Sequence, residues 1–104
     1  MKECAYISGK MTGKADYGRK DFRMAEIIVR KAGYEVVNPA MLPIGKTYEQ
    51  YMSVCLPMVA FADFVVLLPD WENSEGAKAE VAYATCLRKK IVPLSAMMEK
   101  AEAV

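Results

Sequence analysis

A glycine-punctuated basic loop follows the first short apolar run of the chain, in YISGKMTGKADYG at residues 6–18. It is close to the phosphate-binding P-loop, which needs four residues between its glycines and a Ser or Thr after its lysine. Here three residues separate Gly9 from Gly13, and Ala15 follows Lys14. The nucleotide-triphosphatase interpretation therefore fails, although a glycine-punctuated basic loop directly after a short apolar run still needs a purpose.

A second loop, in LPDWENSEGAKAEVAYA at residues 68–84, places Ser74 and Gly76 at the predicted start of a helix and Glu80 about one turn inside it. A helix N-terminus offers unpaired N–H groups to anions, and glycine lets a ligand approach the backbone. Structural alternatives stay open: Ser74 as a plain N-cap, Glu80 as a solvated helix residue. Trp71 is either a platform for ligand stacking, an anchor for a subunit interface, or a residue buried against the sheet.

The composition narrows the chemistry. The chain has 104 residues, three cysteines without CxxC spacing and no histidine, so zinc and redox sites are poorly supported and we expect no metal and no cofactor. Without histidine, carboxylates are the natural acid, base or nucleophile. A net charge of +1 argues against a binder of nucleic-acid polymers. Short apolar runs and an N-terminus without a signal-peptide pattern predict a cytoplasmic protein without membrane contact.

Hydrophobic periodicity predicts alternating strands and helices in a single domain at residues 1–104. The expected strands are residues 4–8, 34–37, 64–68 and 91–94. The expected helices are residues 19–32, a capped helix that opens at Thr47 and is kinked by Pro57, residues 75–88, and a short tail helix at 96–104. Pro93 suggests that the last strand lies at an edge.

This alternation predicts a flavodoxin-like or Rossmann-like parallel sheet of order 2-1-3-4, with helices on both faces. In such sheets ligands bind beyond the carboxyl ends of the strands, where the strand order reverses. Here that point lies between the first and third strands, which the two loops follow. The fold class therefore brings Ser8, Gly9 and Gly13 towards Ser74 and Gly76.

Four segments taken in order resemble the nucleoside 2-deoxyribosyltransferase-like family, especially its short phage and bacterial members of uncharacterised function. They are YISGKMTG, the helix that contains Phe22, GYEVVNP and LLPDWENSEGAKAEVAYA, and together they span nearly the whole chain. The resemblance implies a flavodoxin-like fold, a homo-oligomer with sites near subunit interfaces, and chemistry at the N-glycosidic bond of a nucleoside or nucleotide. The expected partner is therefore such a small molecule.

The resemblance also implies roles for single residues. Gly76-Ala-Lys-Ala-Glu80 matches the stretch whose glutamate attacks the anomeric carbon in characterised relatives, which makes Glu80 the candidate nucleophile. Tyr6 matches an aromatic position near the reacting sugar. Ser74 matches a serine of the related 2′-deoxynucleoside 5′-monophosphate N-glycosidases, where the transferases have an aspartate, and this change favours a phosphate over a free hydroxyl.

The opening loop then has an expected use: Ser8, Gly9 and Gly13, with Lys10, Lys14 or Arg19 nearby, hold the sugar-phosphate end of a nucleotide, unless the loop is only a solvated surface segment. One position departs from the family pattern. Eight residues before Asp63, where active relatives place the aspartate that protonates the leaving base, this chain has Cys55. A thiol is a poor substitute acid. Two hypotheses follow: an N-glycosidase or deoxyribosyltransferase, or a non-catalytic nucleotide-binding or regulatory module.

Overall fold

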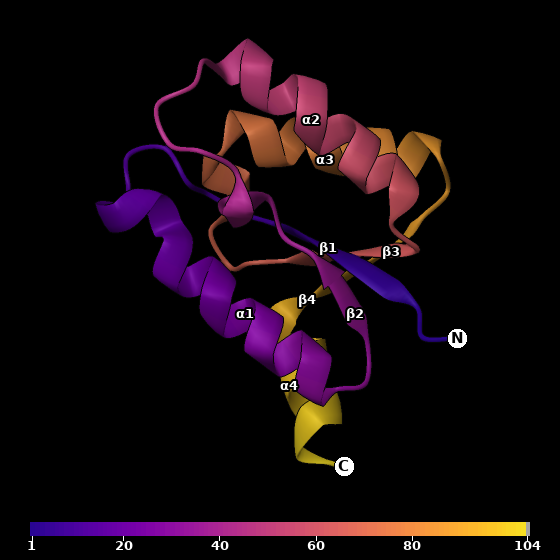
Figure 1. Ribbon diagram of the computed structural model, residues 1–104. Coiled ribbons are helices and arrows are strands. Elements are labelled where there is room, and N and C mark those ends of the chain that lie inside the picture. The colour runs from indigo at the N-terminus through magenta and orange to yellow at the C-terminus, as the bar shows by residue number, and fades with distance from the viewer. Residues whose placement is uncertain (104) are drawn as a thin grey trace.

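The computed structural model, which describes residues 1–103, is built around one four-stranded sheet (Figure 1). Its strands are β1 (Cys4–Ser8), β2 (Glu35–Val37), β3 (Phe64–Leu67) and β4 (Lys90–Pro93). All pairs are parallel and the order is β2-β1-β3-β4. The predicted fold class, strand order and edge position of Pro93 are confirmed.

Helices cover both faces of the sheet, as predicted. They are α1 (Arg19–Lys31), α2 (Tyr48–Phe61), α3 (Glu75–Cys86) and α4 (Leu94–Glu102). In Figure 1, α2 and α3 lie together above the sheet, while α1 and α4 lie on the other side. The expected capping box is present at the start of α2, where Thr47 and Gln50 bond each other's backbone N–H groups.

Several element ends differ from the expected ones. β2 begins one residue later than residues 34–37 predicted, and α3 ends at Cys86 because the chain turns there, with Arg88 at a φ of 58°. The last strand is shifted back by one residue, so that Leu94 already belongs to α4. α2 runs through Pro57 as one helix, and the expected kink stays a prediction. Val104, the end of the expected tail helix, lies outside the described residues.

The alternation of β-strand side chains divides the core into two layers. Ala5 of β1 and Val66 of β3 pack against α1 and α4, in a cluster with Val29 and Met97. Tyr6 points to the opposite face, towards α2 and α3, where Val59 belongs to its cluster. Successive residues of β1 therefore pack against different helices, and only one face of the strand is turned towards α3.

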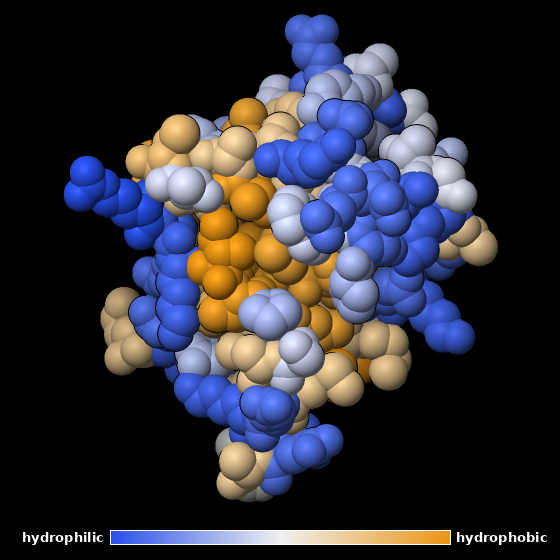
Figure 2. Space-filling view, turned by 180° about the vertical axis from the view of Figure 1, so that it is seen from behind, coloured by the Kyte–Doolittle hydropathy of each residue, from blue (hydrophilic) through white to orange (hydrophobic). Residues whose placement is uncertain are grey.

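No helix within residues 1–103 combines the length and the apolar character needed to cross a bilayer. The reverse face of the molecule presents a central hydrophobic area bordered by hydrophilic side chains (Figure 2). The edge strand β4 contributes half-buried Ile91 and Val92 to the molecular surface.

Candidate active site

Glu80 stands at the centre of a buried hydrogen-bond network between α3 and β1. The Tyr6 hydroxyl donates to its Oε2 atom and the Ser8 hydroxyl to its Oε1 atom, each at 2.7 Å. Glu80 is only 6% exposed, and both donors are completely buried. The two carboxylate oxygens are thus fixed by neutral groups, so the orientation of the carboxylate is set without an ion pair.

The local sequence explains this geometry. Tyr6 and Ser8 are two residues apart on one strand, so they point to the same face of the sheet. On α3, the Ser74 side chain caps the helix by accepting the Ala77 N–H at 3.1 Å, which fixes the first turn. Glu80 follows on the helix face turned towards β1. The N-cap interpretation of Ser74 is confirmed, whereas Glu80 is not a solvated helix residue.

The buried network changes how these groups ionise. Burial raises the pKa of the Glu80 carboxyl, against the hydrogen bonds from Tyr6 and Ser8, which lower it. Burial also raises the pKa of the Tyr6 phenol well above its usual value, and the neighbouring Glu80 charge adds to this effect. Tyr6 therefore stays a hydrogen-bond donor throughout the physiological range, and Glu80 stays an acceptor when ionised.

A cavity of about 360 Å³ opens above Glu80. Five of the residues predicted for the site line it: Gly9, Arg19, Ser74, Gly76 and Glu80. Tyr6 and Ser8 lie beneath it, in contact with Glu80. Gly13 and Trp71 are not among the lining residues, and Trp71 is half-buried in a short 3-10 turn. The ligand-binding roles of all these residues stay predictions.

The cavity has further walls that the two predicted loops did not include. Part of the lining comes from the segment after β2 and from the start of α2: Pro39, Leu42, Ile44, Gly45, Lys46, Tyr48, Tyr51 and Met52. The sequence offered a signal for the segment after β2, because the carboxyl end of β2 neighbours that of β1 in the predicted strand order. The aromatic residues of α2 carried no such signal, since apolar helix positions usually pack into the core.

The two predicted loops are joined by an ion pair and a backbone hydrogen bond. Asp70 accepts the Lys10 N–H at 3.1 Å and the Lys14 ammonium at 2.5 Å, and Lys14 also pairs with Asp21 at 2.5 Å. Burial favours the neutral acid, but the Lys14 charge and the Lys10 N–H outweigh it and lower the pKa of Asp70. Lys14 therefore has a structural role between the loops, which we name the Lys14–Asp70 bridge.

The basic loop ends in an unusual turn beside the cavity. Asp16 and Tyr17 have φ values of 55° and 51°, and Gly18 continues the turn at 72°. Left-handed backbone costs an ordinary L-residue roughly 1–2 kcal/mol. A side chain at Gly18 would lie 2.7 Å from the Lys10 carbonyl oxygen, so only glycine fits there. Tyr17 of this turn lines the cavity.

Arg19 begins α1 directly after this turn and supplies a cation to the cavity wall. Its Nη2 group donates to the Leu42 carbonyl oxygen at 2.9 Å, which ties α1 to the segment after β2. Its Nε atom is buried and has no hydrogen-bond partner. A buried donor without a partner costs about 1–3 kcal/mol.

A family model described as "Domain of unknown function (DUF4406)" matches residues 3–93, which contain β1 to β4 and all the cavity residues. The chain belongs to the DUF4406 family. No curated protein matches it. Among solved structures, it is similar to a 2-desoxiribosyltransferase from Leishmania mexicana, with a TM-score of 0.69 and 17% sequence identity. The match covers 88% of this chain and 63% of that one, and at this identity it concerns the fold.

Cys55 of this DUF4406 chain lies on α2 and has two environments at once. It belongs to the buried cluster around Tyr6 and Val59, in agreement with its interpretation as a small core residue. It also lines the cavity that Glu80 lines. Burial raises the pKa of the Cys55 thiol to about 11. The thiol therefore keeps its proton at neutral pH and is a weak proton donor.

Proposed function

We propose that this DUF4406 protein binds a nucleoside or nucleotide in the cavity and breaks its N-glycosidic bond, with Glu80 as the nucleophile. The observation that carries the proposal is the buried Glu80 carboxylate, held at both oxygens by Tyr6 and Ser8 and lining a cavity of about 360 Å³. The fold shared with a 2-desoxiribosyltransferase supports nucleoside chemistry. The same fold carries many other functions, so the proposed function rests on the residues of the site and not on the fold.

The proposed reaction is a double displacement at the anomeric carbon. A Glu80 oxygen attacks C1′ as the base leaves, which captures an oxocarbenium-like centre in a covalent glycosyl ester. Water, or the hydroxyl or base of an acceptor, then attacks C1′ and releases the carboxylate. Tyr6 and Ser8 orient Glu80 in both steps, because their hydrogen bonds to it do not depend on the substrate.

For the sugar-phosphate end we propose the wall formed by Gly9, Arg19, Ser74 and Gly76. Gly9 accepts no side chain, because a Cβ atom there would lie 2.7 Å from Leu68, and it lines the cavity without one. Gly76 stands in the first turn of α3, where N–H groups and the helix dipole favour an anion. The Arg19 guanidinium on this wall supplies a positive charge that suits a phosphate.

The proposal is tested by incubating the protein with a panel of 2′-deoxynucleosides and their 5′-monophosphates and measuring free base by liquid chromatography. We expect base release, faster from the monophosphates. Addition of a second free base distinguishes transfer from hydrolysis, because only a transferase makes a new nucleoside. Ligand binding without any base release would leave the alternative below.

The alternative is a non-catalytic nucleotide-binding or regulatory module, and Cys55 favours it. The cavity wall that holds this thiol lacks a strong proton donor for a departing base. In that case the panel ligands raise the thermal midpoint of the protein but are not cleaved. Glu80→Gln then changes the affinity for these ligands, and no base is released by either protein. Calorimetry on both proteins separates the two functions.

We further propose that the protein forms a homo-oligomer. Large apolar side chains are exposed along α2, including Tyr48 at 57% and Phe61 at 75%, and Glu49 is the only charged residue of that helix. A patch of this kind commonly marks an interface between copies. Light scattering over a range of concentrations tests this, and a constant monomer mass would contradict it.

A further inference from the structure

Few side chains that line the cavity can donate or accept a proton. Of the residues within 1–103 that line it, Glu80 is the only one with a carboxyl group, and the chain contains no histidine. The Cys55 thiol holds its proton tightly, for the reason given above. Arg19 and Lys46 add positive charge to the lining, but neither carries a carboxylic acid or an imidazolium. An uncharged base that leaves this cavity therefore finds no carboxylic acid or imidazolium to protonate it.

The tyrosines do not fill this gap. Tyr17, Tyr48 and Tyr51 line the cavity, but a phenol is a far weaker acid than a carboxylic acid. The Tyr51 hydroxyl is already occupied, because it donates to the Pro43 carbonyl oxygen at 2.7 Å. What the tyrosines offer instead is aromatic surface. Electron-rich ring faces attract cations, and flat cationic ligands in particular.

We propose that the preferred substrates are N-glycosides whose heterocycle carries a positive charge at the glycosidic nitrogen or within its ring system. Pyridinium nucleotides and N7-alkylated purine nucleotides are the chemical classes that fit. This inference rests on the proposed function, since it takes Glu80 as the nucleophile. It identifies the leaving groups that need no proton donor beyond the side chains of this cavity.

The reaction balances without a proton donor. A Glu80 oxygen forms a bond to C1′, and the C1′–N bond breaks with its electron pair moving to the heterocycle, which cancels the positive charge. The base leaves neutral. Water then attacks C1′, the ester bond to Glu80 breaks, and the water proton passes to solvent. Each turnover yields the free sugar phosphate, the neutral base, one proton and the regenerated carboxylate.

The charges of the cavity agree with a phosphorylated substrate of this class. Arg19 and Lys46 line the same cavity as Glu80, so its wall has one more positive than negative side chain. A nucleotide with a cationic base has a phosphate that offsets Arg19 and Lys46, while its ring faces the tyrosines and Glu80. An uncharged nucleoside has neither the phosphate for Arg19 and Lys46 nor the cationic ring for the tyrosines and Glu80.

The test compares 7-methylguanosine 5′-monophosphate with guanosine 5′-monophosphate, which differ by one methyl group and one positive charge. Nicotinamide mononucleotide is the second cationic substrate, and every rate is corrected for the reaction without protein. We expect base release from the cationic members to be at least about 10²-fold faster, since acid assistance is worth on the order of 10²–10⁴-fold to an uncharged base. Equal rates overturn the inference and leave the proposed function standing.

A chemically faster leaving group alone also predicts some preference, so a variant must separate the two causes. Cys55→Asp places a carboxylic acid on the cavity wall, and we expect it to raise the rate on the guanosine nucleotide relative to the methylated one by about 10²-fold. Cys55→Ser is the matched control, because it changes polarity without adding an acid. Circular dichroism and ligand binding establish that both variants are folded. An unchanged ratio in folded Cys55→Asp contradicts the inference.

If neither these nucleotides nor any member of the deoxynucleotide panel is cleaved, the proposed function fails, and binding decides what remains. Calorimetry with the same pair then asks whether the cavity prefers a cationic ring. We expect the methylated nucleotide to bind several-fold more tightly, and Tyr48→Leu to remove most of this difference because leucine keeps the bulk but lacks the ring face. Equal affinities for the two nucleotides refute charge selection by the cavity.

Discussion

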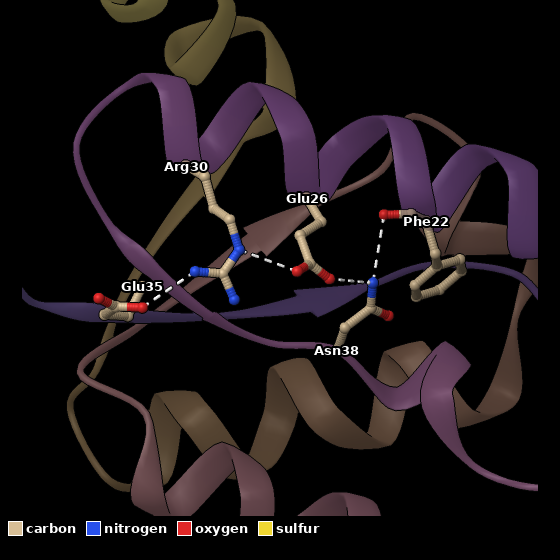
Figure 3. A network of polar contacts seen from close by, with 5 residues as sticks. All are labelled: Phe22, Glu26, Arg30, Glu35 and Asn38. Atoms are coloured by element: carbon tan, nitrogen blue, oxygen red, sulfur yellow. Dashed lines mark hydrogen bonds and ion pairs between the residues drawn. The ribbon is translucent and has the colours of Figure 1, made fainter.

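Glu26 and Glu80 each accept two side-chain hydrogen bonds, yet the pKa of one carboxyl falls and that of the other rises. Glu26 lies on α1, where Arg30 and Asn38 donate to it at 2.9 Å each, and Arg30 continues to Glu35 on β2 (Figure 3). Burial pulls its pKa upwards, but these donors outweigh burial and lower it. Glu80 has only neutral donors and deeper burial, so burial prevails.

The difference lies in the charge of the donors. An arginine neutralises a carboxylate, fixes it in an ion pair and makes it a poor nucleophile. Hydroxyl groups orient a carboxylate equally well but leave its charge uncompensated. The Glu26 network is therefore suited to joining α1 to β2, whereas the Glu80 network leaves a buried carboxylate without a compensating charge, at a cost in stability.

The largest expected effect separates the two glutamates by activity. Glu80→Gln should lower base release by about 10³-fold or more, because an amide lacks both the charge and the nucleophilicity of the carboxylate. Glu26→Gln, the matched control, should retain most of the activity. Chromatographic rates on the fastest substrate of the panel measure both, with calorimetry to verify ligand binding. A similar loss in both variants would remove the functional distinction between the networks.

The next effect concerns the neutral donors. The hydrogen bonds of Tyr6 and Ser8 lower the pKa of Glu80, so Tyr6→Phe or Ser8→Ala should raise it further. In the proposed reaction the ionised form of Glu80 is the nucleophile, so the acidic limb of the pH–rate profile should move to higher pH. The rate at a fixed pH on that limb should fall about tenfold, equivalent to about 1.4 kcal/mol. Asn38→Ala removes a donor of Glu26 instead, and its profile should coincide with that of the parent protein.

A third test uses stability alone. Ionisation of Glu80 is penalised in the folded state, and the penalty is absent below its ordinary pKa of 4.5 and complete above the raised one. Glu80→Gln should therefore raise the thermal midpoint at neutral pH and lose this advantage in acid. Glu26 has the opposite effect on stability. Its ionised form stabilises the folded state above the ordinary pKa of 4.5, and this stabilisation disappears as the pH falls through the lowered pKa. Scanning calorimetry from neutral to acid pH should show the two variants converging.

The smallest effect belongs to the Lys14–Asp70 bridge, where a cation again lowers the pKa of a carboxyl. Asp70→Asn keeps an acceptor for the Lys10 N–H and removes the ion pair with Lys14. Both side chains are partly exposed, so we expect a loss of about 0.5–1 kcal/mol in denaturant unfolding. High salt should weaken the parent protein but not the variant. A loss unaffected by salt would show that the bridge acts through packing.

The capping box and the strand-ending Pro93 could be predicted from local sequence. The sheet order followed from the alternation of strands and helices together with the right-handed crossover rule, because that rule leaves few possible topologies. The burial of Glu80 required tertiary structure, since Tyr6 and Ser8 are more than 70 residues away from it. The turn at Asp16 and Tyr17 was missed for another reason. Aspartate adopts left-handed backbone more often than most residues but tyrosine does not, so two such residues in succession carry no clear sequence signal and depend on the surrounding loop.

The position of β4 also affects how the protein behaves at high concentration. An edge strand exposes unpaired backbone groups that can recruit a strand from another molecule. Pro93 closes β4 with a residue that has no N–H group, and α4 begins at the very next position. A foreign strand can therefore extend this sheet over a short stretch at most, so self-association through this edge is restrained even though Ile91 and Val92 are apolar.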